Sequence, residues 1–151
     1  MSLFSSLSVS ASGMAAQRSR TDVLVENLAN AETTRTPDGG PYRRKDVVFR
    51  TVDAGSAFSS LLSKEMDVFS RRNQLQTGVE VEETLLDERQ PERRFIPGHP
   101  DADKDGYVSF PNVNPAEEMV DLMSASRGFQ ANVSAMTAVK DMLNRSIDLL
   151  K

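Results

Sequence analysis

The sequence contains no cysteine and no tryptophan, and aromatic residues make up only 6% of its 151 positions. The lack of cysteine excludes disulfides, thiolate zinc sites and cysteine catalysis. The single histidine, His99, lies in a loop between Gly98 and Pro100, where an imidazole is usually solvated, and a catalytic serine would have no other base. No nucleotide-binding glycine loop is present. The sequence therefore predicts no enzyme activity, no catalytic or metal-binding residue and no cofactor.

Long apolar runs and an excess of basic residues are also missing. No run approaches the ~20 apolar residues of a membrane span. The start, MSLFSSLSVSASGM, carries no basic residue before Arg18, so a Sec-type signal peptide is not expected and any export would use another route. A formal charge of −4 argues against binding to nucleic acid or an anionic membrane.

The one basic cluster, residues 43–45, lies in the turn-rich stretch TRTPDGGPYRRKD. No aromatic residues alternate with these charges as base stacking would require. A solvated or ion-paired loop is the simpler interpretation, and a contact with an acidic partner surface is the alternative.

Helical periodicity dominates both ends of the chain, where apolar residues recur at spacings of three and four. The residues predicted to pack against other helices are Leu7, Met14, Val25 and Leu28 near the start and Met119, Leu122, Phe129, Val133, Met136, Leu143, Ile147 and Leu150 near the end. Every seventh residue from Leu122 to Leu150 is apolar, which is a heptad pattern. Both ends are therefore expected to form helices that need partner helices.

The two predicted helices differ in their local signals. Asn114 can cap the C-terminal helix, Pro115 suits its first position and Glu117 can complete a capping box. The N-terminal helix is rich in serine, and Gly13 costs about 1 kcal/mol relative to alanine. The N-terminal helix is therefore expected to become ordered only when another surface covers its apolar face.

The middle of the chain predicts short strands at 47–52, 78–86 and 106–110, a short helix from Phe58 to Phe69, and a loop over 89–100. The expected fold is mainly α with a small β region: long terminal helices paired as an α-helical hairpin or coiled coil, and an irregular middle that contains a β-hairpin. The expected division is an N-terminal assembly helix (1–33), a loop and β region (34–110) and a C-terminal assembly helix (111–151).

The stretch DADKDGYVSF, residues 101–110, resembles the first half of a calcium loop, with aspartates at positions 1, 3 and 5 and a glycine at position 6. Position 12, which requires a bidentate glutamate, is Asn112, and prolines at 91, 97 and 100 prevent an entering helix. An Asp- and Gly-rich turn is the expected structure, with a weak irregular cation site as the alternative.

Two segments resemble the family of bacterial flagellar axial proteins. Residues 10–49 carry Gly13, Met14, Gln17, the box Asn27, Leu28, Ala29 and Asn30, and then Pro41 and Tyr42. Residues 106–150 carry a Pro-Asn-Val-Asn turn that contains Asn112 and Asn114. The continuation through Pro41 and Tyr42 is similar to the proximal rod proteins of the basal body. Residues 54–95 match no pattern, and we interpret them as an elaboration of one lineage.

The resemblance implies a structural subunit of the flagellar rod, a hollow helical shaft that crosses the periplasm, transmits torque and conducts exported subunits. The implied partners are copies of this chain, other rod proteins and the flagellar type III export apparatus, with no nucleic acid or small-molecule substrate. Export without a cleaved signal peptide is also implied. Another axial position, in the rod, hook or a junction, is the alternative.

Overall fold

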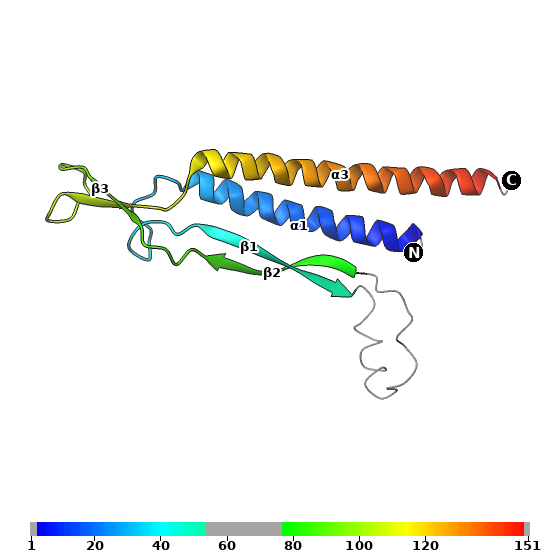
Figure 1. The fold of residues 1–151 in the computed structure, drawn as a ribbon, viewed down its shortest axis with the longest axis horizontal. Helices are drawn as coiled ribbons and strands as arrows, with labels where there is room; N and C mark the ends of the chain where they lie inside the picture. The colour runs from blue at the N-terminus through cyan, green and yellow to red at the C-terminus, as the bar shows by residue number, and fades with distance from the viewer. Residues whose placement is uncertain (1–2, 54–76, 150–151) are drawn as a thin grey trace, which may run out of the picture. The chain divides into compact units, whose positions relative to one another are not determined.

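The computed structural model describes residues 3–53 and 77–149. Its elements, in chain order, are α1 (Leu3–Ala29), β1 (Lys45–Asp53), β2 (Thr77–Leu86), β3 (Glu92–Phe95), β4 (Tyr107–Phe110) and α3 (Pro115–Asp148) (Figure 1). The strands form two separate two-stranded sheets, β1–β2 and β3–β4. The predicted helix from Phe58 to Phe69 and the predicted packing residue Leu150 lie outside the described residues.

The predicted fold class, long terminal helices around a small β region, is confirmed. One element was predicted wrongly, because β3 lies in the stretch assigned to a loop. It pairs antiparallel with β4, with Arg94 opposite Val108. Phe95 packs edge-on against Tyr107 at a ring distance of 5.3 Å. The sequence of β3, ERRF, is charged and lies between prolines, so local patterns do not predict a strand there. The strand depends on its pairing with β4, which comes later in the chain.

The chain divides into two compact units. The first contains Met1–Arg18, Phe49–Glu82 and Arg127–Lys151, and the second contains Ser19–Val48 and Glu83–Ser126. Both units therefore contain part of α1, part of α3 and part of the β1–β2 hairpin. Each unit is described separately below.

In the first unit, α1 and α3 approach each other closely at two glycines. A Cβ atom added at Gly13 would lie 2.9 Å from Nδ2 of Asn132, and one added at Gly128 would lie 3.2 Å from Cδ of Gln17. Each amide side chain thus rests on the backbone of the opposite helix. Because residue 13 lies beside 132 and residue 17 beside 128, the helices run antiparallel. Gly13, which weakens the isolated helix, is what permits this contact.

The start of β2 is fixed to α1 in the same unit. The hydroxyl of Ser12 accepts a hydrogen bond from the backbone N–H of Val79 at 3.1 Å and donates one to the carbonyl of Val9 at 2.8 Å. A Cβ atom at Gly78 would lie 3.1 Å from this hydroxyl oxygen. A serine that lowers helix propensity therefore supplies a hydrogen-bond partner for a strand amide.

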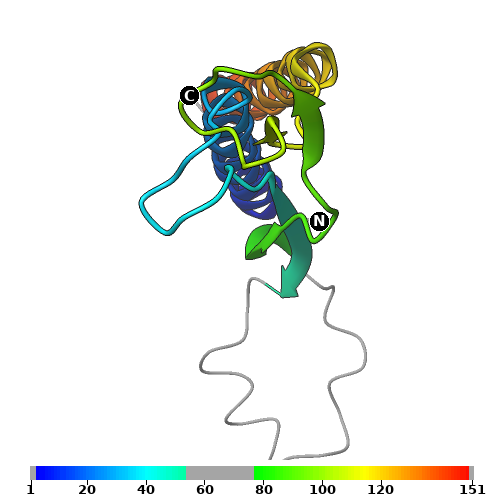
Figure 2. The same ribbon diagram turned by 90° about the vertical axis from the view of Figure 1, so that its left-hand side faces the viewer.

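In the second unit, a loop returns the chain from the end of α1 to the start of β1 (Figure 2, light blue). Gly39 and Gly40 have φ values of 87° and 81°, which glycine adopts without steric cost. Backbone hydrogen bonds between Thr36 and these glycines close the turn. The N–H of Tyr42 then donates to the carbonyl of Thr33, so Tyr42 lies beside the last turn of α1.

The core of the second unit is small. Its fully or nearly fully buried apolar residues are Leu24 of α1, Val108 of β4 and Ala125 of α3. Arg20 and Asp121 form an ion pair at 3.4 Å at the margin of the helix contact. Because so few apolar side chains are buried, the arrangement of the elements in this unit depends on buried polar contacts.

We expect Gly128→Leu to lower the free energy of unfolding, because the new side chain would collide with Gln17. Overpacking costs about 1–3 kcal/mol, partly offset by the ~1 kcal/mol that glycine costs in a helix. The matched control is Ala131→Leu on the exposed face of α3, where the same side chain meets no neighbour. Urea unfolding followed by circular dichroism measures both, and equal stabilities would show that the helices do not approach closely at Gly128.

Candidate functional site

The side chain of Asn27 connects α1 to the start of β1. Its Nδ2 donates to the carbonyl of Lys45 at 2.8 Å, and its Oδ1 accepts the N–H of Lys45 at 2.9 Å. The amide therefore pairs with the Lys45 backbone as a residue of an adjacent strand would. Asn27 is fully buried, so this pairing is shielded from water.

The same amide joins two further side chains. Its Oδ1 accepts the hydroxyl of Tyr42 at 2.9 Å, and its Nδ2 also donates to Oε2 of Glu118 at 3.2 Å. Every donor and acceptor of the Asn27 amide is thus used by α1's three neighbours: the loop, β1 and α3. We call Asn27, Tyr42, Arg44 and Glu118 the junction.

Glu118 carries a carboxylate that is only 2% exposed. Nε of Arg44 donates to its Oε1 at 2.6 Å, and Arg44 also lies 3.6 Å from Asp46. Burial opposes the charge of the Arg44 guanidinium, but the hydrogen bond and the negative charge of Glu118 outweigh it and raise the pKa of Arg44. A buried carboxylate of this kind requires its partner, because unpaired burial costs several kcal/mol.

Tyr42 is buried in the junction beside two acids. Burial, followed by the charges of Glu26 and Glu118, raises the pKa of the Tyr42 hydroxyl from 10.0 to about 12. The phenol therefore stays protonated as a donor to Asn27 over the physiological pH range.

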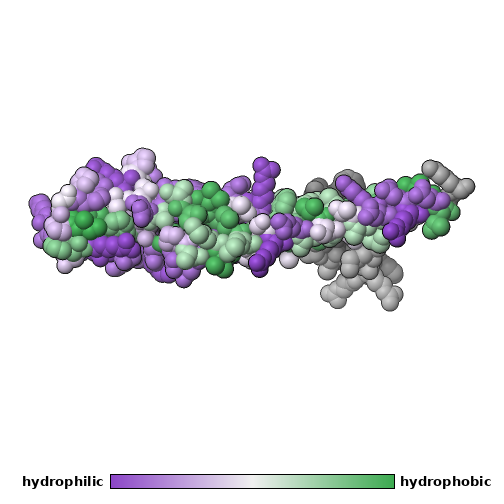
Figure 3. Space-filling view, turned by 90° about the horizontal axis from the view of Figure 1, so that it is seen from above, coloured by the Kyte–Doolittle hydropathy of each residue, from purple (hydrophilic) through white to green (hydrophobic). Residues whose placement is uncertain are grey.

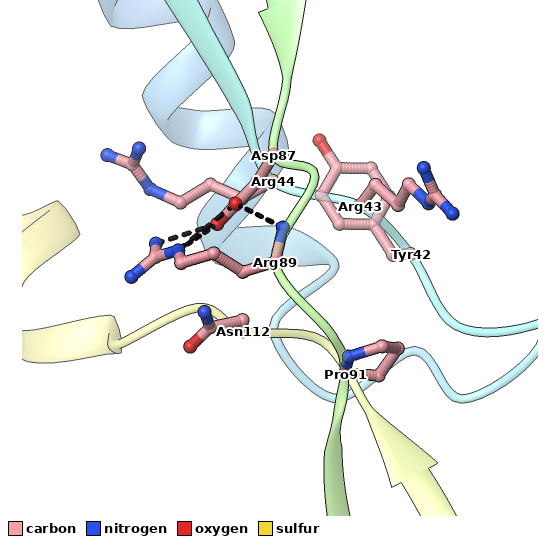
Figure 4. Close-up of a pocket in the computed structure, with 7 residues that line it drawn as sticks. All are labelled: Tyr42, Arg43, Arg44, Asp87, Arg89, Pro91 and Asn112. Carbon is pink, nitrogen blue, oxygen red and sulfur yellow. Dashed lines mark hydrogen bonds and ion pairs between the residues drawn. The ribbon is translucent and has the colours of Figure 1, made fainter.

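The basic cluster at 43–45 is mostly ion-paired, as the simpler interpretation predicted. Arg44 pairs with Glu118 and Asp46, and Lys45 pairs with Glu26. Arg43 is exposed. The structure thus leaves one of the three cations directed away from its neighbours (Figure 4).

A shallow pocket adjoins the junction (Figure 4). It is lined by Tyr42, Arg43, Arg44, Asp87, Arg89, Pro91 and Asn112. Nε of Arg89 donates to both carboxylate oxygens of Asp87, at 3.0 and 2.8 Å, and these contacts are the main reason that the pKa of Asp87 is lowered. The pocket brings together three arginines and one carboxylate, which pairs with Arg89, and its lining places no nucleophile beside a base.

Two of the three aspartates in the loop at 101–106 accept hydrogen bonds that hold the loop in place. Asp101 accepts the hydroxyl of Thr34 at 2.8 Å, and Asp103 accepts the backbone N–H groups of Asp105 and Tyr107. The hydrogen bond from Tyr107 is the main cause of the lowered pKa of Asp103. Within residues 3–53 and 77–149, no group of three or more acidic or histidine side chains could hold a metal ion.

The predicted packing residues divide into two sets. Leu7, Met14, Leu28, Leu122, Met136 and Leu143 are half-buried, whereas Val25, Met119, Phe129, Val133 and Ile147 are exposed. On α3, the residues that face α1 are instead Glu118, Ala125, Asn132 and Val139, also spaced by seven. The apolar heptad therefore overlaps the margin of the buried face, since Leu122, Met136 and Leu143 are half-buried and Phe129 is exposed.

Exposed apolar side chains also gather over the first turns of α3 (Figure 3). Met119, Val120 and Met123 are each more than half exposed. They lie in the second unit, within about one and a half turns of buried Glu118. This end of α3 thus presents an apolar surface that α1 does not cover.

The family-motif residues of the sequence meet at the contacts between elements. Asn27 and Tyr42 are buried in the junction, and Gly13 and Gln17 form the close helix contact. Asn114 caps α3 by accepting the N–H of Ala116 at 3.1 Å, as predicted, and Asn30 donates to the carbonyl of Glu26. The remaining members are half-buried Met14, Leu28, Pro41 and Asn112, and exposed Ala29.

Sequence reasoning missed the roles of Arg44 and Glu118. In the sequence, Arg44 is one of three adjacent cations at 43–45, and Glu118 simply follows the capping-box residue Glu117. The available signal was the spacing of seven that links Glu118 to Ala125 and to Asn132, since a charged residue on an inward heptad position requires a buried partner.

Two family models match the chain. Residues 7–35 match the flagella basal body rod protein model, and residues 104–149 match the C-terminal model of the flagellar basal body rod FlgEFG proteins. Curated relatives named flagellar basal-body rod protein FlgC match over nearly the whole length of both chains.

The relative from Bacillus subtilis is 43% identical over 100% of both chains. The relative from Borreliella burgdorferi is 40% identical over 100% of this chain and 99% of its own. The relative from Salmonella typhimurium is 39% identical over 99% and 98%. In the part of the chain that the structure describes, neither helix has the length and apolarity needed to cross a bilayer.

The raised pKa of Tyr42 predicts a late phenol titration. The chain has two tyrosines and no tryptophan, so Tyr107→Phe leaves Tyr42 as the only phenol. We expect its ultraviolet absorbance to titrate near pH 12, about two units above a free tyrosine. Because a raised folded pKa stabilises the protonated state, this contribution to stability is complete below pH 10 and is lost as the pH rises toward 12. Titration near pH 10 with the helical signal intact would contradict burial of the phenol.

The Arg44–Glu118 pair predicts a large coupling energy. A double-mutant cycle with Arg44→Met and Glu118→Gln should give a coupling of about 1–3 kcal/mol in urea unfolding, because Arg44→Met leaves the buried carboxylate of Glu118 without its charged partner. The control cycle uses Arg94→Met and Glu92→Gln, an ion pair at 3.0 Å with both side chains more than half exposed. We expect roughly 0–1 kcal/mol there. Equal couplings would mean that the junction pair is not shielded from solvent.

Proposed function

The chain belongs to the FlgC family of flagellar basal-body rod proteins and is a structural rod subunit, and from this premise we propose that its terminal helices build the rod by packing against helices of neighbouring subunits. The proposed partners are copies of this chain and other rod proteins. The rod would act as a hollow shaft that transmits torque and conducts exported subunits.

One observation carries this proposal: the apolar surface of α3 is wider than the face that α1 covers. Glu118, Ala125 and Val139 are buried, whereas Met119, Phe129, Val133 and Ile147 on the adjacent flank are exposed. On a helix of 3.6 residues per turn, these two sets lie side by side. An exposed apolar stripe of this kind is typical of a surface that a partner covers.

Burial of this stripe provides a driving force for assembly. Covering one large apolar side chain contributes roughly 1.5–3 kcal/mol. Several such residues in each subunit could offset the conformational entropy that is lost when the terminal helices are fixed in place. The weak helix propensity of the serine-rich start of α1 fits a segment that gains part of its stability from neighbours.

We further propose that the protein reaches the periplasm through the flagellar type III export apparatus without a cleaved signal peptide. Membership of the flagellar basal-body rod family is what supports this route. We propose no enzymatic activity, no small-molecule substrate and no nucleic-acid partner. The ion-paired arginines beside the junction support this view, because they already have counter-charges within the chain.

Substitution of the stripe tests the assembly proposal. Phe129→Asp places a charge on the exposed flank, and Leu143→Asp does so at its half-buried margin. Both should reduce incorporation into isolated basal bodies and swimming in soft agar at least tenfold, while the amount of protein in the cell stays unchanged. These assays use a strain that lacks the native gene.

The matched control is Gln130→Asp, which adds the same charge at an exposed polar position of α3. We expect normal swimming with this variant. Circular dichroism of each purified variant separates a failure of folding from a failure of assembly. Normal incorporation of both Phe129→Asp and Leu143→Asp would refute the proposal.

A further inference from the structure

Two strands of this chain have uncovered sides with opposite charge. In β3, all four residues are exposed, and among the described residues the strand pairs with β4 alone. In β2, the run Glu82–Leu86 is exposed on both faces, and the strand pairs with β1 alone within the same set. At the start of β2 the N–H of Val79 is already bonded to Ser12 of α1, so the run Glu82–Leu86 of β2 and the whole of β3 are the parts whose uncovered backbone groups could accept another strand.

The charges of the two strands match in one register. Consecutive residues of a strand point to opposite faces. Arg93 and Arg94 therefore place one cation on each face of β3, and Glu82 and Glu83 place one anion on each face of β2. An antiparallel pairing that sets Arg93 opposite Glu83 sets Arg94 opposite Glu82, and it also places Phe95 opposite Val81.

The same charges disfavour pairing of like strands. Two antiparallel β3 strands aligned end to end would place Arg93 of one opposite Arg94 of the other, and two β2 strands centred on their acidic pair would place Glu82 opposite Glu83. Like charges directly opposite each other destabilise a sheet. Each edge is thus protected against its own copy and is complementary to the other edge.

The cations and anions involved form exposed ion pairs within the chain, and the two arginines also lie over aromatic rings, Arg93 over Tyr107 at 5.2 Å and Arg94 over Phe110 at 4.9 Å. Arg93 pairs with Asp103 at 2.5 Å and Arg94 with Glu92 at 3.0 Å, and both arginine side chains are more than half exposed. Glu82 lies 3.9 Å from Arg50, also with both side chains exposed. Exposed ion pairs contribute little to stability, so these partners can be exchanged.

We propose that β3 of one subunit adds to the free edge of β2 in a neighbouring copy of this chain, antiparallel, with Arg93 opposite Glu83 and Arg94 opposite Glu82. This inference rests on the proposed function, since it requires copies to be neighbours in the rod. Because the two edges differ, the contact is heterologous, and repetition of it produces a ring or a helical assembly. The edge contact supplies a register that the apolar helix stripe, which can slide, does not.

Engineered cysteines test the register directly, because the chain contains no cysteine of its own. Directly opposite residues of an antiparallel pair bring their Cβ atoms close enough for a disulfide. The variant Phe95→Cys with Val81→Cys is expressed in a flagellated strain that lacks the native gene. Basal bodies are isolated and oxidised, and we expect covalent dimers at twice the 16.6 kDa of the monomer, together with higher multiples.

The controls separate the possible outcomes. Each single-cysteine variant should stay monomeric, because the proposed contact brings position 95 to position 81 and neither position to its own copy. The pair Ile96→Cys with Leu85→Cys, which a parallel pairing would bring together, should stay monomeric, and efficient cross-linking there instead would overturn the antiparallel register. Normal amounts of the Phe95→Cys, Val81→Cys variant in basal bodies without any cross-link would overturn the edge contact alone. If the double-cysteine variant is missing from basal bodies, while the cysteine-free chain is incorporated in a parallel experiment, the proposed interface is also contradicted. Two small side chains at these positions should be tolerated where the strands pair.

Charge exchange provides a second, independent test. Arg93→Glu with Arg94→Glu, or Glu82→Arg with Glu83→Arg, should each lower incorporation and swimming at least fivefold. The fourfold variant that combines both pairs restores opposite charges at both positions, so we expect it to recover most of the loss. If the fourfold variant loses as much incorporation and swimming as the two double variants lose together, the opposite charges of β2 and β3 do not pair in the assembly. If Phe129→Asp and Leu143→Asp block assembly but the charge-exchange variants assemble normally, the helix-based proposal stands and only the edge contact is refuted.

Discussion

The pairing of the Asn27 amide with the backbone of Lys45 is the interaction on which the second unit depends. A side-chain amide has the same donor and acceptor as a peptide group, so Asn27 satisfies Lys45 N–H and C=O at the point where β1 begins. An aspartate would lack the donor, and a leucine would leave both backbone groups without partners in a buried position, at a cost of about 1–3 kcal/mol each. Tyr42 and Glu118 then hold the amide in the one orientation that serves Lys45.

This junction explains why polar residues define a region with few buried apolar side chains. Leu24, Val108 and Ala125 are too few to specify a unique arrangement by packing. The buried carboxylate of Glu118 is tolerated only where Arg44 and Asn27 meet it, so it fixes the loop, β1 and α3 relative to each other within the unit. In some proteins, buried polar or ionic pairs contribute to conformational specificity in this way.

The two sides of α3 serve different needs. Toward α1, the helix offers Ala125 and Gly128 together with the short polar side chain of Asn132, which allows close approach in the manner of small residues at helix contacts. Larger side chains such as Phe129 and Val133 lie on the adjacent flank and stay exposed. If the large apolar residues of α3 were buried within the chain, few would remain exposed for contacts with neighbouring subunits. The distribution therefore fits a protein whose folding within one chain and assembly between chains use separate faces of one helix.

The sequence by itself determined the helical ends, the three strands with clear β patterns, the Asn114 cap and the family, because these depend on periodicity, local capping and residue motifs. Only the tertiary structure decided which face of α3 meets α1. A heptad pattern marks an apolar stripe but does not say whether the partner lies in the same chain or in another. It also decided the partners of Glu118, Arg44 and Asn27 and the pairing of β3 with β4. Residues 27, 44 and 118 are far apart in the sequence, and no local pattern records a hydrogen bond that exists only when three separate elements meet.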